Sequence, residues 1–212
     1  MATRKRILIT AGPTWVAIDK ARVISNIASG ETGFILADKF RSSRIKVTLL
    51  LGPGYFFGRQ KGIKIIRFKY FSQLQFFLKE ELRRNQYAAV IHTAAVADYK
   101  PKKIIKNKAS SRLRSWRINL IPTKKLVNSL RDYSDKLLTV GFKFEPDAKR
   151  NKLIKKGKVL LRQADLDLVV ANSSINKNYC AYILNNTDCF GPFFTKSKMA
   201  SNLAKLVMEK IK

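Results

Sequence analysis

Short apolar runs alternate along the chain with longer segments whose apolar residues recur at helical spacing. Ile7-Leu8-Ile9 and the run IKVTLLL over 45–51 have the length and continuity of strands buried on both faces. Apolar residues within 71–84 fall three and four positions apart, as on one face of a helix. By these criteria we predict strands over 6–10, 45–51, 64–67, 88–95, 118–121, 137–142 and 166–171, helices over 31–40, 71–84, 123–131, 147–163 and 197–211, and a hairpin over 179–184 and 193–195.

This alternation of strands and helices predicts an α/β fold. Strand–helix–strand units favour parallel pairing, so we expect a doubly wound, mostly parallel sheet with helices on both faces and a C-terminal β-hairpin. No internal repeat or linker divides the chain, and residues 1–212 are expected to form one domain. Ligands of such sheets bind outside the carboxyl ends of the strands, so functional residues are expected in the loops at those ends.

The loop between the first predicted strand and the first predicted helix ends in small residues and two glycines. Gly30 lets the main chain approach an anion closely, and the helix start behind it offers unpaired N–H groups and a partial positive charge. Asn26 adds an amide donor suited to a developing oxyanion, and Arg22 adds a planar cation suited to a carboxylate or phosphate. An ordinary glycine turn with a polar cap is the alternative. The candidates in this group are Arg22, Ser25, Asn26, Ser29, Gly30 and Gly33.

A second group of candidates follows the predicted strand 88–95. Its small residues, Thr93 and Ala94 among them, leave room for a flat ring or a ribose against the main chain. Asp98 is placed to accept from sugar hydroxyls or to face a metal. A buried strand followed by an aspartate turn is the alternative. His92, the sole histidine, is interpreted as a core residue rather than a general base because it belongs to a buried strand.

Residues 100–117 break the alternation because they are rich in lysine, arginine and serine and have almost no apolar periodicity. We expect a mobile basic loop, or flap, in this segment. Its lysines between 100 and 108 are suited to close over a triphosphate as point charges. A solvated charged loop is the alternative.

The charge of the whole chain favours anionic partners. Lys and Arg number 43 against 14 Asp and Glu, a formal net charge of +29. Three explanations stay open and can overlap: a host that uses lysine heavily, an anionic small-molecule substrate, and nucleic acid. A nucleic-acid-binding module would bind with strong salt dependence and no sequence preference, but no named recognition motif is visible.

Several other functional classes lack their motifs. The sequence contains no Walker-type phosphate loop, no G-x-G-x-x-G fingerprint and no visible Ser/His/Asp set. A dinucleotide-binding oxidoreductase, the remaining enzyme alternative, would need that fingerprint and an acidic residue ending the second strand, which instead ends in Leu51-Gly52-Pro53. With one histidine, Cys180 and Cys189 cannot complete a Cys/His zinc site, and we expect two reduced thiols near the hairpin.

Targeting signals are also missing. No apolar run reaches the roughly 18 residues of a membrane span, and no signal-peptide cleavage pattern follows the basic start. We therefore expect a cytoplasmic protein.

Five motifs follow one another along the chain: ILITAGPT (7–14), IDKARVISNIASGETG (18–33), HTAAVADYKP (92–101), VGF (140–142) and LDLVVAN (166–172). In this order they resemble the motifs of phosphopantothenate–cysteine ligase, also called phosphopantothenoylcysteine synthetase, a family of coenzyme A biosynthesis. The resemblance covers roughly residues 6–172, and more loosely the closing hairpin and helix. It implies a Rossmann-like fold.

The resemblance also implies a two-step reaction. The carboxylate of 4′-phosphopantothenate attacks the α-phosphate of CTP, giving an acyl-cytidylate and pyrophosphate, and the amine of L-cysteine then displaces CMP. Magnesium (Mg2+) is the expected cofactor, CTP the co-substrate with ATP as the open alternative, and no flavin is expected on this chain. Family members are homodimers whose pantothenate site draws on both subunits. Because the chain begins at the ligase's first strand, we expect a stand-alone ligase that works with a separate phosphopantothenoylcysteine decarboxylase.

Roles can be carried over where the motifs match. Asn26 is expected to stabilise the acyl-cytidylate or its tetrahedral successor, Arg22 to help hold this intermediate, and Lys108 to grip the triphosphate from the flap. The other matched residues contact the nucleotide: Ser29, Gly30 and Gly33 at phosphate, His92, Thr93 and Ala94 along the nucleotide, Asp98 at its ribose or cation side, Thr123, Lys124, Lys125 and Leu126 at cytosine, Phe142 beside it, and Lys158 with Arg162 as a phosphate-binding pair.

The sequence departs from the family pattern at the flap and at the cytosine-reading segment. The flap motif Lys-x-Lys-Lys is Lys108-Ala109-Ser110-Ser111 here, so two cations are missing, and Lys103 and Lys106 are candidates to replace them. The family's Pro-Asp at the cytosine-reading segment is Lys124-Lys125. These differences concern nucleotide selectivity and turnover rather than the fold.

Overall fold

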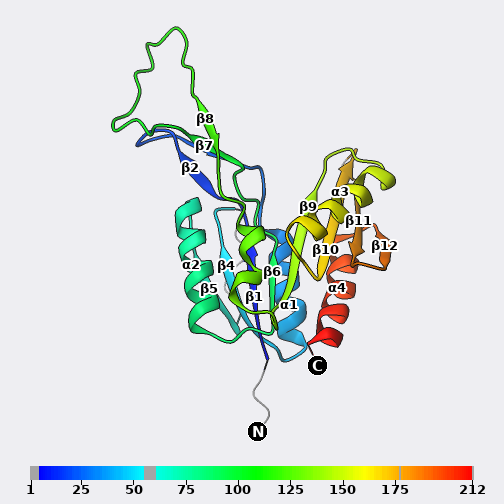
Figure 1. The fold of residues 1–212 in the computed structure, drawn as a ribbon. Helices are drawn as coiled ribbons and strands as arrows, with labels where there is room; N and C mark the ends of the chain where they lie inside the picture. Colours follow the sequence, from blue (N-terminus) through cyan, green and yellow to red (C-terminus); the bar gives the residue numbers. More distant parts are fainter. Residues whose placement is uncertain (1–4, 55–60, 177, 212) are drawn as a thin grey trace.

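The computed structural model describes residues 5–54, 61–176 and 178–211. Among these residues, an eight-stranded sheet forms the centre of the molecule. Its strands in chain order are β1 (Arg6–Ala11), β4 (Lys46–Leu51), β5 (Ile63–Arg67), β6 (Ala89–His92), β9 (Leu138–Phe144), β10 (Leu168–Ile175), β11 (Asn178–Leu184) and β12 (Cys189–Phe193). Across the sheet they lie in the order β12-β11-β10-β9-β6-β1-β4-β5 (Figure 1).

The strand order reverses between β1 and β6. From β1 the chain builds outward through β4 to β5, then returns to pair β6 with the other side of β1 and continues through β9 to β10. All these pairs are parallel, whereas β10, β11 and β12 pair antiparallel and form the C-terminal hairpin. The predicted doubly wound, mostly parallel sheet is confirmed, and its switch point lies between β1 and β6.

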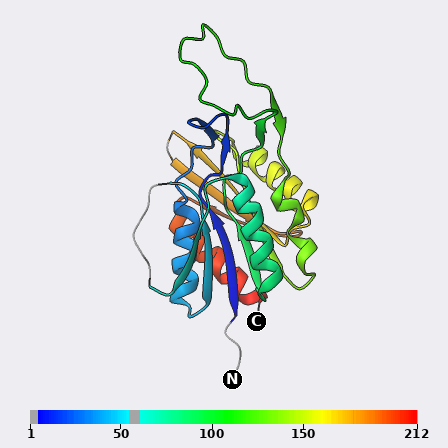
Figure 2. The same ribbon diagram turned by 90° about the vertical axis from the view of Figure 1, so that its left-hand side faces the viewer.

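Helices cover both faces of the sheet. Those in the described part of the chain are α1 (Glu31–Ser42), α2 (Phe71–Arg84), α3 (Arg150–Gln163) and α4 (Lys196–Lys210), with two 3-10 turns, η1 (Leu126–Ser129) and η2 (Arg131–Tyr133). Apolar side chains of α1 and α4 share one buried cluster, and those of α2, η1 and α3 pack on the opposite face (Figures 1 and 2). None of the described helices has both the length and the apolar surface needed to cross a membrane.

Two hydrophobic clusters, one on each face of the sheet, explain why the strands are continuous apolar runs in the sequence. Ile7 and Ile9 of β1 pack against α1 and α4, and Leu8 between them packs against α2. Alternate side chains of a strand point to opposite faces, so a central strand between two helical layers needs apolar residues at every position.

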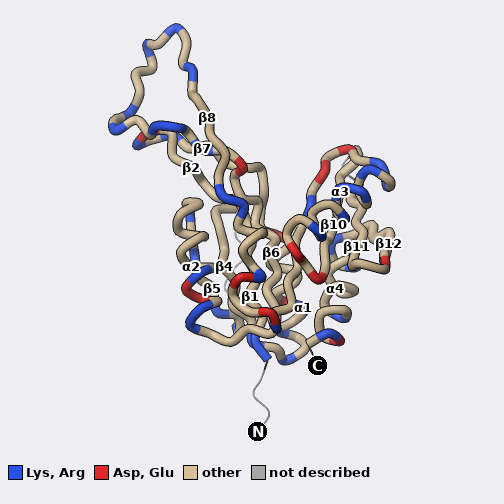
Figure 3. Tube along the Cα trace, in the orientation of Figure 1, with Lys and Arg blue, Asp and Glu red and all other residues tan. Residues whose placement is uncertain are grey.

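Two small hairpins stand beyond the carboxyl ends of the parallel strands. The first pairs β2 (Trp15–Ala17) with β3 (Val23–Ser25), and the second pairs β7 (Tyr99–Pro101) with β8 (Leu120–Pro122). Between β7 and β8 the chain runs out from the body as a long basic loop (Figures 1 to 3). We call residues 102–119 the flap. The flap predicted over 100–117 took in two residues of β7, whereas β8 overlaps the strand predicted over 118–121.

Three sequence predictions of local structure need correction. The predicted strand 88–95 ends at His92, and the hairpin of β2 and β3 was not predicted. The predicted helix 123–131 is wrong, because this segment is extended up to Lys125 and then forms η1 and η2. The hydroxyl of Thr123 donates to the carbonyl oxygen of Ala97.

The basic helix predicted over 147–163 begins at Arg150 and runs through Gly157 without a break. Gly157 faces β10, where an added Cβ would lie 2.8 Å from Cβ of Ala171. The glycine therefore marks close packing of helix on sheet rather than a helix end.

Candidate active site

The loops that leave β1 and β6 stay paired beyond the edge of the sheet. The N–H of Ala95 donates to the carbonyl of Gly12 at 3.0 Å, and the N–H of Thr14 donates back to Ala95 at 3.3 Å. The hydroxyl of Thr14 accepts from the N–H of Ala97 at 2.9 Å. Main-chain groups of the first and second candidate regions thus lie side by side at the switch point, where sheets of this kind bind ligands.

Helix α1 begins at this point, with its N-terminus held close to β1. Gly30, its N-cap, has φ +82°, a conformation that glycine adopts without strain. An added Cβ on Gly33 would lie 2.4 Å from Cβ of Ala11, so only glycine permits this approach of helix to strand. The hydroxyl of Ser29 accepts from the N–H of Glu31 at 3.3 Å. The first turn of α1 combines unpaired N–H groups with the positive end of the helix dipole, as an anion site requires.

Asn26 connects the two candidate regions directly. Its amide nitrogen donates to the carbonyl oxygens of Ala95 at 3.2 Å and Val96 at 3.0 Å. The side chain is exposed, so a ligand can reach it. The amide nitrogen has two main-chain acceptors, and donation to a substrate oxygen would exchange one of these bonds for another.

His92 is buried at the end of β6 and is 6% exposed. Its Nδ1 lies 2.8 Å from the hydroxyl of Thr10 on β1. Burial lowers the pKa of His92 to about 4, which keeps the ring neutral at pH 7. These are the surroundings of a core histidine, in agreement with the interpretation from sequence.

The cytosine-reading candidates lie beside Asp98. The N–H of Thr123 donates to the carbonyl of Asp98 at 2.9 Å, and the carboxylate of Asp98 forms an ion pair with the ammonium of Lys125. Both partners of this pair are exposed. Leu126 is buried in the core, and Lys124 is exposed. The segment 123–126 therefore lies beside the second candidate region, and its Lys125 is paired with the carboxylate of Asp98.

Arg22 contacts the flap. Its guanidinium binds the carboxylate of Asp19 at 2.6 Å and the carbonyl oxygen of Ala109 at 3.3 Å. Lys108, the neighbour of Ala109, is exposed. Sequence reasoning missed Asp19, although an aspartate three positions before an arginine in a short connection is a signal for a side-chain-supported turn.

The remaining candidates lie further along the sheet. Phe142 is half-buried on β9, directly after the pairing of Gly141 with His92. Lys158 and Arg162 lie on one face of α3 and line a hollow of about 470 Å3, together with Asn151, Ile154, Lys155 and Val159. The predicted phosphate-binding pair thus lines a hollow on the surface of α3.

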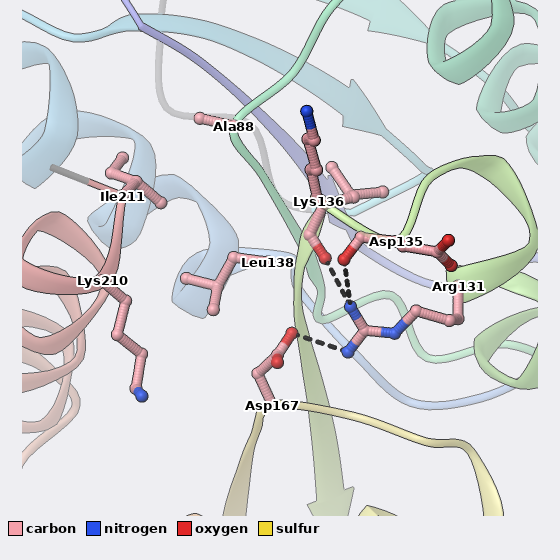
Figure 4. Close-up of a pocket in the computed structure, with 9 residues that line it drawn as sticks. Ala88, Arg131, Asp135, Lys136, Leu138, Asp167, Lys210 and Ile211 are labelled. Carbon is pink, nitrogen blue, oxygen red and sulfur yellow. Dashed lines mark hydrogen bonds and ion pairs between the residues drawn. The ribbon is translucent and has the colours of Figure 1, made fainter.

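A second hollow, of about 290 Å3, lies at the opposite end of the sheet (Figure 4). Arg131 crosses it and binds the carboxylate of Asp167 at 2.9 Å, the hydroxyl of Thr139 at 3.1 Å and the carbonyl of Leu137 at 2.9 Å. Because its guanidinium is bonded to the protein and the hollow lies at the amino ends of the strands, we assign it a structural role.

The site contains few groups for a metal ion. No group of three or more His, Cys, Asp or Glu side chains gathers as a metal site in the part of the chain that the structure describes. Asp98, in the loop that leaves β6, is a carboxylate of this region, and a metal ion bound there would replace Lys125 as its partner. This set fits a magnesium ion that takes most of its oxygens from nucleotide phosphates and water, as Mg2+ commonly does, rather than a protein-built cage.

The comparisons with known proteins agree with the fold. The family model described as "DNA/pantothenate metabolism flavoprotein C-terminal domain" matches residues 2–210. The chain is 31% identical over 213 residues to the coenzyme A biosynthesis bifunctional protein CoaBC of Borreliella burgdorferi, a match that covers 96% of this chain and 52% of the relative. It therefore spans about half the length of that relative.

Two solved structures share its architecture. The C-terminal domain of a coenzyme A biosynthesis bifunctional protein CoaBC superposes with a TM-score of 0.78 at 25% identity, covering 97% of this chain and 95% of that one. A Cab2 mutant in complex with phosphopantothenate-cysteine superposes with a TM-score of 0.79, covering 98% and 86%, and at 18% identity this likeness shows the fold alone. The chain belongs to the DNA/pantothenate metabolism flavoprotein C-terminal domain family.

Proposed function

We propose that this chain is a phosphopantothenate–cysteine ligase of coenzyme A biosynthesis. The observation that carries the proposal is the bond from the Asn26 amide to the carbonyls of Ala95 and Val96. It joins the two signature segments, 18–33 and 92–101, at the switch point of the sheet. The names of the relatives and the bound phosphopantothenate-cysteine of the Cab2 structure support the same assignment.

In the first step, a carboxylate oxygen of 4′-phosphopantothenate bonds to the α-phosphorus of CTP, and pyrophosphate leaves with the electrons of the broken P–O bond. In the second step, the amine of L-cysteine attacks the acyl carbon, loses a proton, and displaces CMP. Both steps need positioning and charge stabilisation more than a protein nucleophile. A chain without a Ser/His/Asp set is suited to such chemistry.

The residues at the switch point divide this work. The N-terminus of α1 at Gly30 seats phosphate, while Thr93 and Ala94 leave the nucleotide room beside the main chain. Asn26 donates to the oxygen that gains charge when cysteine attacks. Lys108 brings a cation from the flap to the triphosphate.

Other residues fix the nucleotide's position. Asp98 accepts from the ribose or faces its metal, residues 123–126 contact cytosine, and Phe142 packs beside it. Lys158 and Arg162 supply a further pair of cations. Magnesium, when bound with the nucleotide, would neutralise charge on the phosphates.

The distribution of charge suits two anionic substrates. Lysines and arginines are concentrated on the flap and on α3 (Figure 3). Clustered cations raise the local concentration of anions and their rate of association. The flap and α3 therefore offer cations on the side of the sheet where we place the substrates.

Assembly and location belong to the same proposal. We expect a cytoplasmic homodimer whose pantothenate site draws on both subunits. Tyr99, Leu120 and Ile121 of the hairpin formed by β7 and β8 are apolar and exposed in the single chain, which supports burial of this hairpin in an assembly. A phosphopantothenoylcysteine decarboxylase would consume the product.

The test is pyrophosphate release from the purified chain with 4′-phosphopantothenate, cysteine and magnesium. CTP and ATP are supplied in separate reactions. Release that depends on phosphopantothenate is expected, faster with CTP than with ATP. Absence of release with both nucleotides, from a folded chain, would reject the ligase activity. Salt-dependent binding to nucleic acid by the same preparation would then favour the alternative use of the positive charge.

A further inference from the structure

A buried carboxylate organises the connection between β2 and β3. The side chain of Asp19 is fully withdrawn from solvent. Its Oδ1 accepts from the N–H groups of Ala21 at 2.7 Å and Arg22 at 2.8 Å. Its Oδ2 accepts from the guanidinium of Arg22 at 2.6 Å and from the N–H of Ala109 at 3.0 Å. Three of these donors belong to the turn itself, and the fourth comes from the flap, 90 residues away along the chain.

The guanidinium of Arg22 holds the same point of the flap from the other side. Both of its terminal nitrogens lie 3.3 Å from the carbonyl oxygen of Ala109. Its central carbon lies 5.1 Å from the ring centroid of Trp116, within range of a cation–π interaction. Asp19 and Arg22 together thus bind both main-chain polar groups of Ala109 and one aromatic ring of the flap.

These contacts fall on two of the three flap residues that are shielded from solvent. Within the flap, Ala109, Trp116 and Ile118 are half-buried and every other residue is exposed. One more main-chain bond, from the N–H of Ile105 to the carbonyl of Ile18, meets the same turn at 2.9 Å. A long, basic, exposed loop has little apolar surface to hold it in place, so its position depends on these few bonds.

The charge state of Asp19 suits a permanent contact. The N–H of Ala109 lowers the pKa of Asp19 most, the turn's own N–H groups and Arg22 lower it further, and burial opposes them, which leaves the pKa at about 2. The carboxylate is therefore ionised throughout the physiological pH range. The guanidinium of Arg22 faces this carboxylate directly.

We propose that Asp19 is a positioning residue for the flap, acting with Arg22 as a latch on Ala109. The latch fixes Lys108, the neighbour of Ala109, relative to β3, the strand that leads directly into Asn26. The effect on catalysis rests on the proposed ligase function, whereas the fastening of the flap does not. Asp19 contacts neither substrate in this proposal and acts through Lys108 and Arg22.

The fastening is tested without substrates, through Trp116. The chain has two tryptophans, so Trp15→Phe leaves Trp116 as the sole indole reporter. In that background, Asp19→Asn is compared with Asp38→Asn. Asp38 also forms an ion pair with an arginine three residues on, Arg41, but does so on the exposed surface of α1. Each variant removes one carboxylate charge from an Asp–Arg pair, but only Asp19 contacts the flap.

Loss of the latch is expected to raise acrylamide quenching of Trp116, and to raise tryptic cleavage between residues 102 and 117 about tenfold, the value of one charge-assisted hydrogen bond. Asp38→Asn should change neither. Quenching and cleavage unchanged in Asp19→Asn would overturn the latch. If Asp19→Asn does not fold, the variant Ala109→Pro removes the N–H that the flap donates to Asp19. The residues around Ala109 are exposed, so this change should be tolerated. Quenching and cleavage of this variant then test the latch.

Kinetics then separate positioning from general damage. With the latch open, KM for the nucleotide is expected to rise about tenfold while kcat falls less, because Lys108 spends less time at the triphosphate. A loosened flap with unchanged KM would overturn the positioning role. If the wild-type chain makes no product, the proposed function fails, but the fluorescence and cleavage results still decide the latch.

Discussion

The hydroxyl of Thr10 lies 2.8 Å from Nδ1 of His92, in the interior of the sheet where β1 and β6 run side by side. The same hydroxyl accepts from the N–H of Ala94 at 3.3 Å. A hydroxyl that accepts there can donate its own hydrogen to Nδ1, which leaves the ring proton on Nε2. This neutral histidine joins the two strands at the switch point, and its burial has a consequence for stability.

The chain should lose stability as the pH falls from 7 to 5 because of His92. The folded pKa, about 4, lies below the ordinary value, so below about pH 6.5 the unfolded chain binds a proton that the folded chain does not. The loss is expected to be about 2 kcal/mol over this range. Chemical unfolding at both pH values measures it. His92 is the only histidine, so His92→Asn, though less stable overall, should show a smaller pH dependence; equal dependence would contradict the assignment.

Asn26→Ala should leave the fold intact and stop the second step of the reaction. The two bonds lost are exposed, and their loss should cost under about 1 kcal/mol of stability. Without the amide donor, the acyl-cytidylate should persist, giving a burst of about one pyrophosphate per site and little further turnover. Rapid-quench measurement of pyrophosphate and acyl-cytidylate tests this.

The control for Asn26→Ala is Asn202→Ala. Asn202 is also exposed, and its amide also donates to a main-chain carbonyl, that of Lys198 on α4. This control should turn over like the wild type. Wild-type turnover in Asn26→Ala as well would remove Asn26 from the mechanism.

The long periodic elements could be predicted from the sequence, and the short ones could not. The helix over 71–84 agrees residue for residue with α2, because its apolar face and its length give a strong signal. The strands β2 and β3 have three residues each, too few for any periodicity to show.

The helix predicted over 123–131 failed for a tertiary reason. Leu126 and Leu130 are buried four residues apart, which imitates helical spacing. However, Thr123 is bonded to Ala97 and Asp98, and Lys125 is paired with Asp98. These contacts, distant in sequence, hold the start of the segment extended.

The parts of the candidate site that belong to a sequence motif could be predicted. The contacts between residues far apart in the sequence could not. The segments around Asn26 and Ala94 were identified from sequence, and they do lie together. That Asp19 and Arg22 both bind Ala109 could not be deduced, because nothing in the local sequence of the flap marks Ala109 as their partner.

Gly33→Ala should destabilise the fold and displace the start of α1. The new Cβ would lie 2.4 Å from Cβ of Ala11 and 3.0 Å from the hydroxyl oxygen of Thr93. Both neighbours belong to strands or loops at the switch point, so relief requires movement of main chain, at about 1–3 kcal/mol. Urea unfolding measures this cost. Thr32→Ala, at the preceding helical position, is the control and should change stability by less than half as much; equal effects would mean that α1 is not tightly packed there.

Lys108→Ala should weaken nucleotide use without altering the fold, because Lys108 is exposed. Loss of a charge-assisted contact with the triphosphate is expected to raise KM for CTP about tenfold. Lys205→Ala, which removes an equally exposed cation from α4, should leave KM unchanged. Initial rates of pyrophosphate release against CTP concentration give both values.

Adding lysines to the flap tests whether flap cations bind the triphosphate. The flap carries serines at positions 110 and 111 where the family pattern has lysines, so Ser110→Lys with Ser111→Lys should lower KM for CTP. Because the added contacts are electrostatic, the gain should shrink as salt is raised from 50 to about 300 mM, where screening is stronger. One outcome is that KM falls in the double lysine variant but stays constant in Lys108→Ala. The triphosphate would then lie near positions 110 and 111, or beside Lys103 and Lys106, rather than at Lys108. If neither variant changes KM, the triphosphate does not meet the flap.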